Sequence, residues 1–231
     1  MDRTTLCIGL LHVEDDLAAD CDHSIAHVHL EMNMNVKIWS GLVTLLCAAS
    51  IEAATANPFP RNAAYPYGIK AVTSSAKTDV QAAYDDWFKN QYEESGNYGR
   101  VKFDDQSYTV SEGIGYGMLI FVYMDNASNN TKAKFDKLWA YYKANSNSNG
   151  VMNWKISGFT NSCSGDNCNG ATDADLDVAM ALMMAYKQWG DASYLTDAKA
   201  LVATIYKNEI STSARGLLKP GDAWESKFNP S

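Results

Sequence analysis

The sequence predicts an all-α fold in which consecutive helices form antiparallel pairs. In five segments the apolar residues recur at spacings of three and four, which is the period of an amphipathic helix. Polar or glycine-containing turns separate these segments, and no alternation of apolar and polar residues is long enough to indicate a strand. The composition, 46% hydrophobic and 20% charged over 231 residues, is typical of a globular protein and excludes a disordered chain.

The first helix is predicted to begin near Thr78, after an irregular entry segment at 57–75 that contains three prolines. The dipeptide Ser95-Gly96 ends its pattern. A short connection over 98–108 then leads to the second helix. The apolar face of the first helix combines Val80, Ala83, Tyr84, Trp87 and Phe88.

Four further helices follow from the same spacing. The polar turn at 145–150 ends the third helix, and Gly190-Asp191 separates the fourth from the fifth. From Ser211 onward the sequence has only loop features. The predicted helical ranges are 110–124, 131–144, 173–189 and 194–208.

Charge and histidine content exclude several functions. The formal net charge is −8, but eight of the 27 acidic and two of the 19 basic residues precede residue 57, so the rest of the chain carries a charge near −2. No basic stripe is present to bind a phosphate backbone, so we expect no nucleic-acid partner. All four histidines precede residue 30. A domain that begins later has no Ser-His-Asp catalysis, and we expect no metal and no cofactor.

Residues 34–56 have the three parts of a secretory signal peptide. A short basic region at 34–37 precedes an apolar stretch at 38–49, and Ala-Thr-Ala at 54–56 is a small-residue cleavage site. The apolar stretch is too short to span a bilayer. We expect residues 1–33 to be upstream sequence included by a wrong start assignment, and the mature protein to be secreted (extracellular or periplasmic) without membrane attachment. A buried N-terminal helix is the alternative.

Two of the five cysteines, Cys163 and Cys168, lie beyond the expected cleavage site. Secretion permits disulfides, and these two bracket a polar tetrapeptide, which favours a local disulfide that stabilises the fold modestly. The alternative is a pair of free thiols, because two cysteines alone do not make a structural zinc site.

Two carboxylates stand at the starts of alternate helices. Glu112 is followed by glycines at 113, 115 and 117, which weaken a helix but permit close approach of a backbone or a ligand. In an up-and-down array the second and fourth helices run parallel, so Glu112 and Asp173 share one end. Paired carboxylates are the groups that most glycosidases use. Asp175 and Asp177 are explained by the helix dipole.

The five tryptophans that follow the expected leader divide into two groups. Trp87, Trp139 and Trp189 fall on apolar helical faces and are interpreted as core residues. Trp154 and Trp224 lie in loops, where either packing or stacking on a sugar ring explains them equally well.

Five segments, taken in order, resemble motifs of glycoside hydrolase family 8. Residues 111–118 (SEGIGYGM) look like the acid-bearing motif, and residues 171–179 (ATDADLDVA) resemble the family signature. The resemblance covers nearly all of residues 57–231. Its remaining segments are 65–68 (YPYG), 150–154 (GVMNW) and 218–224 (LKPGDAW).

This resemblance implies an (α/α)6 barrel and the inverting endo-hydrolysis of a β-1,4-linked glucan, cellulose. Glu112 would be the general acid, and Asp173 would be the second active-site carboxylate, which grips and distorts the sugar in the central subsite. The residues that would line sugar subsites are Trp154, Trp224, Tyr67 and Tyr116.

Other activities stay open within this resemblance. Xylanase, chitosanase and mixed-linkage glucanase are alternatives inside the family, and a non-catalytic sugar-binding helical protein is the alternative outside it. In each case we expect a monomer whose partner is a polysaccharide.

The number of helices departs from the family. An (α/α)6 barrel needs six helix pairs, whereas five helices are predicted before the sequence stops at Ser231. The resemblance implies that the water-activating Asp comes from the missing second half, and inversion needs that base. We therefore expect residues 57–231 to be a partial catalytic domain, an incomplete barrel with apolar faces open to water, and the fragment alone to hydrolyse no glucan.

Overall fold

The computed structural model describes residues 55–61, 63, 66–67, 74–213 and 216–224. The expected upstream extension at 1–33 and nearly all of the expected leader at 34–56 lie outside the described residues. Both therefore stay predictions. None of the helices in the described part of the chain is long and apolar enough to cross a membrane.

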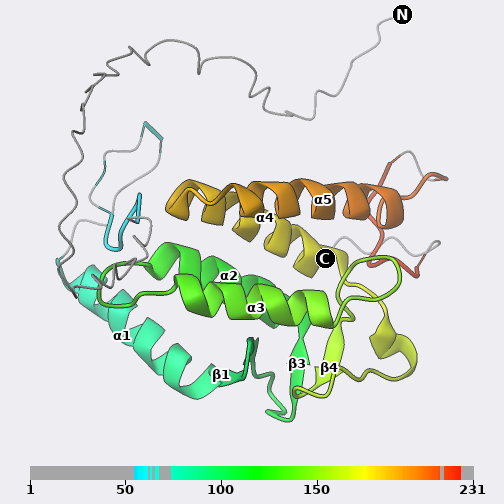
Figure 1. Cartoon of the computed structure of the whole chain (residues 1–231), viewed down its shortest axis with the longest axis horizontal. Helices are drawn as coiled ribbons and strands as arrows, with labels where there is room; N and C mark the ends of the chain where they lie inside the picture. Colours follow the sequence, from blue (N-terminus) through cyan, green and yellow to red (C-terminus); the bar gives the residue numbers. More distant parts are fainter. Residues whose placement is uncertain (1–54, 62, 64–65, 68–73, 214–215, 225–231) are drawn as a thin grey trace, which may run out of the picture. The chain divides into compact units, whose positions relative to one another are not determined.

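All five predicted helices are present, with ends that differ from the prediction by a few residues (Figure 1). Gly190 ends the fourth helix in the left-handed conformation (φ 71°), where its N–H donates to the Tyr186 carbonyl. The Asp191 side chain accepts the Ser193 N–H and caps the fifth. The helices are α1 (Ser74–Gln91), α2 (Ser111–Met124), α3 (Lys132–Ala144), α4 (Thr172–Trp189) and α5 (Ala192–Asn208).

The expectation of a strand-free chain is wrong. Two small antiparallel sheets are present, and the prediction missed them because each strand has only three or four residues. Ser95 ends the first strand of a hairpin rather than a helix, and Gly96 (φ 57°) and Asn97 form the two-residue turn. Strand β1 (Tyr92–Ser95) pairs with β2 (Tyr98–Val101), β3 (Tyr108–Val110) pairs with β4 (Lys155–Ser157), and a short 3-10 helix, η1, spans Gly165–Cys168.

Helices α2 and α4 lie side by side and run parallel. Near their C-terminal ends the Gln188 side chain donates to the Val122 carbonyl (3.0 Å), and the Trp189 indole donates to Asp125 (2.8 Å). Near their N-terminal ends Gly115 lies against the Ala174 carbonyl. The parallel alignment expected from the order of the helices is therefore found.

Aromatic side chains join the other helices to this pair. The Phe135 ring of α3 lies 5.1 Å from the Trp189 ring and 5.3 Å from the Tyr194 ring of α5. The Trp87 ring of α1 packs edge-on against Phe121 of α2 at 5.5 Å. Trp139 and Trp189 are buried and Trp87 is partly buried in this core, so their interpretation as core residues is confirmed.

The helices in the described part of the chain do not close into a ring (Figure 1). Apolar side chains are therefore exposed on helices whose other faces are buried. On α4 the exposed stripe follows spacings of four and three, and α2 exposes two tyrosines. The residues are Leu176, Met180, Met183, Tyr116 and Tyr123.

Candidate active site

Glu112 stands in the first turn of α2, held there by the β3–β4 sheet. Strand β3 leads directly into the helix, and the Ser111 N–H donates to the Trp154 carbonyl at 2.9 Å. The Glu112 side chain is exposed, and its Oε1 accepts a hydrogen bond from the Tyr116 hydroxyl at 2.8 Å. The spacing of four residues places both side chains on one face of α2. The carboxyl group is thus oriented, yet open to a ligand.

Gly115 brings the first turn of α4 against α2. A Cβ at this position would lie 3.0 Å from the Asp177 Cβ and 3.3 Å from the Ala174 carbonyl oxygen. The glycine is therefore needed for close approach of two helices, one of the two uses predicted for it. Because the contact lies within the first two turns of both helices, Glu112 and Asp173 lie at the same end of this helix pair.

Asp177 and Tyr116 both lie within electrostatic reach of Glu112 and Asp173. Burial, followed by the charges of Asp173 and Glu112, raises the pKa of Asp177. The hydrogen bond to Glu112 and then the Glu112 charge raise the pKa of the Tyr116 hydroxyl, with smaller effects from burial, Asp177 and Asp173. Since such effects fall off with distance, the three acids form one cluster around the start of α4.

Trp154 lies at the entrance of α2. Its side chain is half-buried, and the indole N–H donates to the Asp166 carbonyl at 2.9 Å. Cys163 and Cys168 are joined by a disulfide, which closes the loop that contains Asp166. The disulfide loop therefore holds the indole in place one residue before β4, beside the turn that bears Glu112.

Trp224 lies against the segment that precedes α4. Gly221 packs so closely that a Cβ would lie 2.0 Å from the Gly170 carbonyl oxygen and 2.8 Å from the Trp224 ring. The Thr172 N–H donates to the Pro220 carbonyl at 3.1 Å. Trp224 is half-buried, next to the residues that lead into Asp173.

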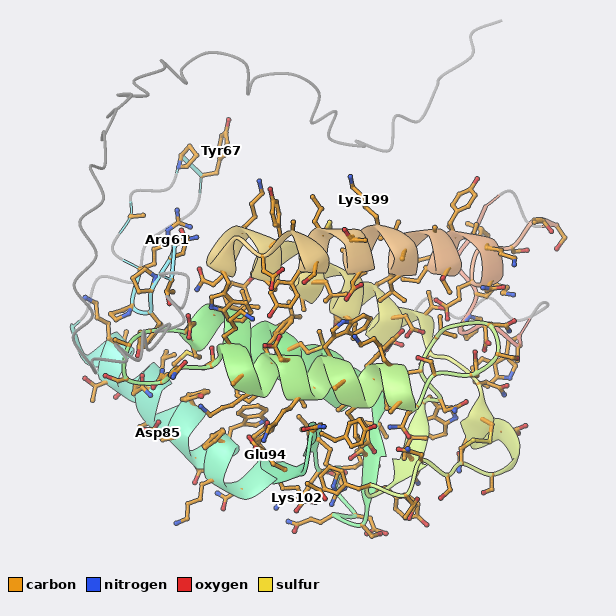
Figure 2. The ribbon with its side chains drawn as sticks, in the orientation of Figure 1. Arg61, Tyr67, Asp85, Glu94, Lys102 and Lys199 are labelled. Atoms are coloured by element: carbon orange, nitrogen blue, oxygen red, sulfur yellow. A yellow bond between two sulfur atoms is a disulfide. The ribbon has the colours of Figure 1, made fainter. Side chains whose placement is uncertain are left out.

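The structure thus gathers Glu112, Asp173, Tyr116 and the two loop tryptophans around the starts of α2 and α4. Tyr67 is not brought to this group. It is 90% exposed and stands clear of the helices (Figure 2). Its part in sugar binding stays a prediction.

Asp177 was assigned to the helix dipole from the sequence, and its place in the acidic cluster was missed. Its spacing of four from Asp173 puts both on one face of α4, which is the signal that would have found it. Among the described residues no group of three or more His, Cys, Asp or Glu side chains is arranged to hold a metal ion. The side chains that the structure places at this end are carboxyl groups beside aromatic planes.

The sequence matches the model of a known protein family. The family model described as "Glycosyl hydrolases family 8" matches residues 57–231. "Endoglucanase 2" from Ruminiclostridium josui is 37% identical over 79% of this chain and 41% of its own length, and "Beta-glucanase" from Niallia circulans is 37% identical over 78% and 46%. The chain therefore spans less than half of the length of these relatives.

Solved structures give the same result. The structure of a beta-1,3-1,4-glucanase from Paenibacillus sp. X4 is 36% identical, with a TM-score of 0.65 over 73% of this chain and 47% of that one. An endoglucanase of glycosyl hydrolase family 8 from Klebsiella pneumoniae is 28% identical, with a TM-score of 0.50 over 64% and 45%.

Proposed function

This chain belongs to the glycosyl hydrolases family 8, and we propose that it forms the N-terminal half of an inverting endo-β-1,4-glucanase. Membership implies a glycosidase that acts on a polysaccharide. The observation that carries the proposal is the crossing at Gly115, which sets Glu112 and Asp173 at one end of two parallel helices. Two carboxyl groups beside a sugar bond are the usual glycosidase machinery.

In the proposed mechanism Glu112 gives its proton to the oxygen of the leaving sugar. Tyr116 orients the carboxyl group, because its hydroxyl holds Oε1 and leaves the second oxygen to act. Asp173, exposed at the start of α4, grips and distorts the sugar between the half-buried planes of Trp154 and Trp224. Asp177 adds negative charge that stabilises the developing oxocarbenium ion.

The base that activates water is proposed to come from the part of the relatives that this chain does not match. An inverting enzyme needs this base on the opposite face of the sugar ring. The 231-residue chain alone is therefore proposed to be inactive. Reducing-sugar release above that of a Glu112→Gln control would contradict this part of the proposal.

The test of function uses the chain extended past Ser231 to the length of its relatives. Activity is measured on carboxymethyl cellulose, lichenan, xylan and chitosan. We expect turnover on carboxymethyl cellulose, a loss of at least ~100-fold in Glu112→Gln, and unchanged affinity for cello-oligosaccharides in that variant. Turnover that survives Glu112→Gln would refute the assignment of the acid. Sugar binding without turnover in the unmodified enzyme would favour a non-catalytic binding protein.

A mixed-linkage glucanase is the second candidate. It is favoured by the likeness to the beta-1,3-1,4-glucanase from Paenibacillus sp. X4, which is 36% identical with a TM-score of 0.65. Faster hydrolysis of lichenan than of carboxymethyl cellulose would identify this activity.

We also propose that residues 34–56 export the protein and are removed. The Cys163–Cys168 disulfide supports export, since disulfides persist in oxidising compartments. The mass of the exported protein tests this, and a mature N-terminus within residues 1–33 would reject it.

A further inference from the structure

Two carboxyl groups outside the acidic cluster are completely buried. Asp175 in the first turn of α4 and Glu209 at the end of α5 are both 0% exposed. The Asp175 Oδ2 atom and both carboxyl oxygens of Glu209 have no hydrogen-bond donor among the described residues. A Cβ built on Gly170 would lie 3.1 Å from Glu209 Oε1 and 3.2 Å from Asp175 Oδ2. The two carboxyl groups therefore border the same small space.

Two ionised carboxylates cannot be buried together at an acceptable free energy, whereas one carboxylic acid and one carboxylate satisfy each other. Burial, followed by the Asp175 charge, raises the pKa of Glu209 to about 9. Burial also raises the pKa of Asp175, to about 7, against the hydrogen bond from the Tyr142 hydroxyl that lowers it. Near neutral pH the pair keeps a proton.

Among the described residues, the side chains that act on the pair carry hydroxyl and carboxyl groups. From α3 the Tyr142 hydroxyl donates to Asp175 Oδ1. From the C-terminal segment Asp222 faces the pair and raises the pKa of both groups. The Lys219 ammonium of the same segment donates to the Asp222 carbonyl at 3.1 Å. The Thr172 hydroxyl faces Glu209 but does not titrate.

Asp175 and Glu209 stand where two parts of the chain meet. Glu209 begins the segment 209–224, of which the structure describes 209–213 and 216–224, and its carbonyl accepts the Lys219 N–H at 2.8 Å. Further along the segment, Asp222 Oδ1 accepts the Gly170 N–H at 2.7 Å. The segment ends at Trp224, and Asp175 is two residues after Asp173.

We propose that Asp175 and Glu209 share one buried proton, and that this hydrogen bond fastens the segment 209–224 to the first turn of α4. The bond positions Trp224 against the residues that lead into Asp173, so both acids are positioning residues. The attachment of this segment to α4 is inferred from the geometry alone. The role of the Trp224 ring as a surface on which a sugar stacks rests on the proposed function. Because both folded-state pKa values are raised, the stability that the pair contributes is lost as pH rises.

The test measures the exposure of Trp224 by acrylamide quenching of its fluorescence, taken as the difference between each protein and its Trp224→Phe counterpart. Measurements at pH 7 and pH 10 bracket loss of the proton. We expect the quenching constant of Trp224 in the unmodified chain to rise about twofold or more at pH 10, because two facing charges repel.

Glu209→Gln is the decisive variant. Its amide N–H donates to the Asp175 carboxylate without titrating, so we expect a low quenching constant at both pH values. Glu209→Ala removes the donor and is expected to give the high value already at pH 7. The matched control is Asp104→Asn, which replaces an exposed acid that is distant in sequence from Asp175 and Glu209. This variant should keep the pH response of the unmodified chain.

A quenching constant that does not change with pH in the unmodified chain would overturn the proposal, as would an equal rise in Glu209→Gln. Far-ultraviolet circular dichroism separates local release from global unfolding. Unfolding at pH 10 that Glu209→Gln prevents supports the shared proton, and unfolding of all variants alike overturns it. Cello-oligosaccharide titration at pH 7 reports separately on function. If no oligosaccharide binds while the quenching results are as expected, the role of Trp224 in sugar binding is refuted and the hydrogen bond between Asp175 and Glu209 is still supported.

Discussion

Three glycines in α2 differ in what an added methyl group would meet, and this difference predicts opposite effects of the same substitution. At Gly113 a Cβ would lie 3.6 Å from Val101, an ordinary van der Waals contact. At Gly117 it would lie 2.7 Å from Val101 Cγ2 and 2.9 Å from Leu138 Cδ1. Both of these side chains are buried, so neither moves away without disturbing the core.

The magnitudes follow from two effects of opposite sign. Replacing a helical glycine with alanine stabilises a helix by about 1 kcal/mol, whereas overpacking a core costs about 1–3 kcal/mol. Gly113→Ala is therefore expected to raise the free energy of unfolding by up to about 1 kcal/mol. Gly117→Ala is expected to lower it by about 1 kcal/mol, a difference of roughly 2 kcal/mol between the two variants.

Urea unfolding followed by circular dichroism measures this difference directly. Thermal unfolding should separate the two variants by about 5 °C in a domain of this size. Equal free energies of unfolding, within about 0.5 kcal/mol, would refute the packing described around Val101 and Leu138.

Gly115→Ala adds a functional test. Its Cβ would press on the Asp177 Cβ at 3.0 Å, separate α2 from α4, and lower activity in the extended enzyme.

Three further variants test other parts of the structure. Tyr116→Phe removes the hydrogen bond to Glu112. We expect kcat/KM of the extended enzyme to fall about tenfold while thermal stability stays unchanged. An unchanged kcat/KM would contradict the orienting role of Tyr116. Replacing Cys163 and Cys168 with serine opens a loop with a sequence separation of 5. The entropy of the opened loop is expected to lower the free energy of unfolding in urea by about 2 kcal/mol. Chemical reduction of the unmodified chain should give the same decrease. Burial alone would raise the pKa of Asp125, but hydrogen bonds to its carboxylate outweigh burial and hold the pKa below the ordinary 3.8. The Asp125 carboxylate therefore stabilises the folded state above pH 3.8, and this contribution is lost as pH falls through the lowered pKa. Asp125→Ala should therefore lower the free energy of unfolding at pH 7 by about 2 kcal/mol and flatten its decrease in acid, and an unchanged acid profile would refute this account.

The helices could be predicted from the sequence because their cause is local. Spacings of three and four place apolar residues on one face over many turns, so Trp139 and Trp189 were correctly assigned to the core. The strands could not be predicted in the same way. Strand β3 pairs with β4 across the whole of α2 and α3, and pairing over that distance leaves no periodic pattern in three residues.

The candidate site could likewise be predicted only in part from the sequence. The types of residue, Glu112 and Asp173 at helix starts with glycines between them, are readable in one dimension, and the order of the helices predicts that they share one end. The role of Gly115 depends on the tertiary structure, because the packing of α4 decides which atoms occupy the space that a side chain would fill.

Asp175 shows this limit most clearly. In the sequence it is one of three acids in a first helical turn, indistinguishable from Asp173 and Asp177. Its burial against Glu209, which lies 34 residues later, follows from how α4, α5 and the segment 209–224 pack together. The behaviour of a carboxyl group depends on the water and charge around it, and these are properties of the packed molecule rather than of the residue.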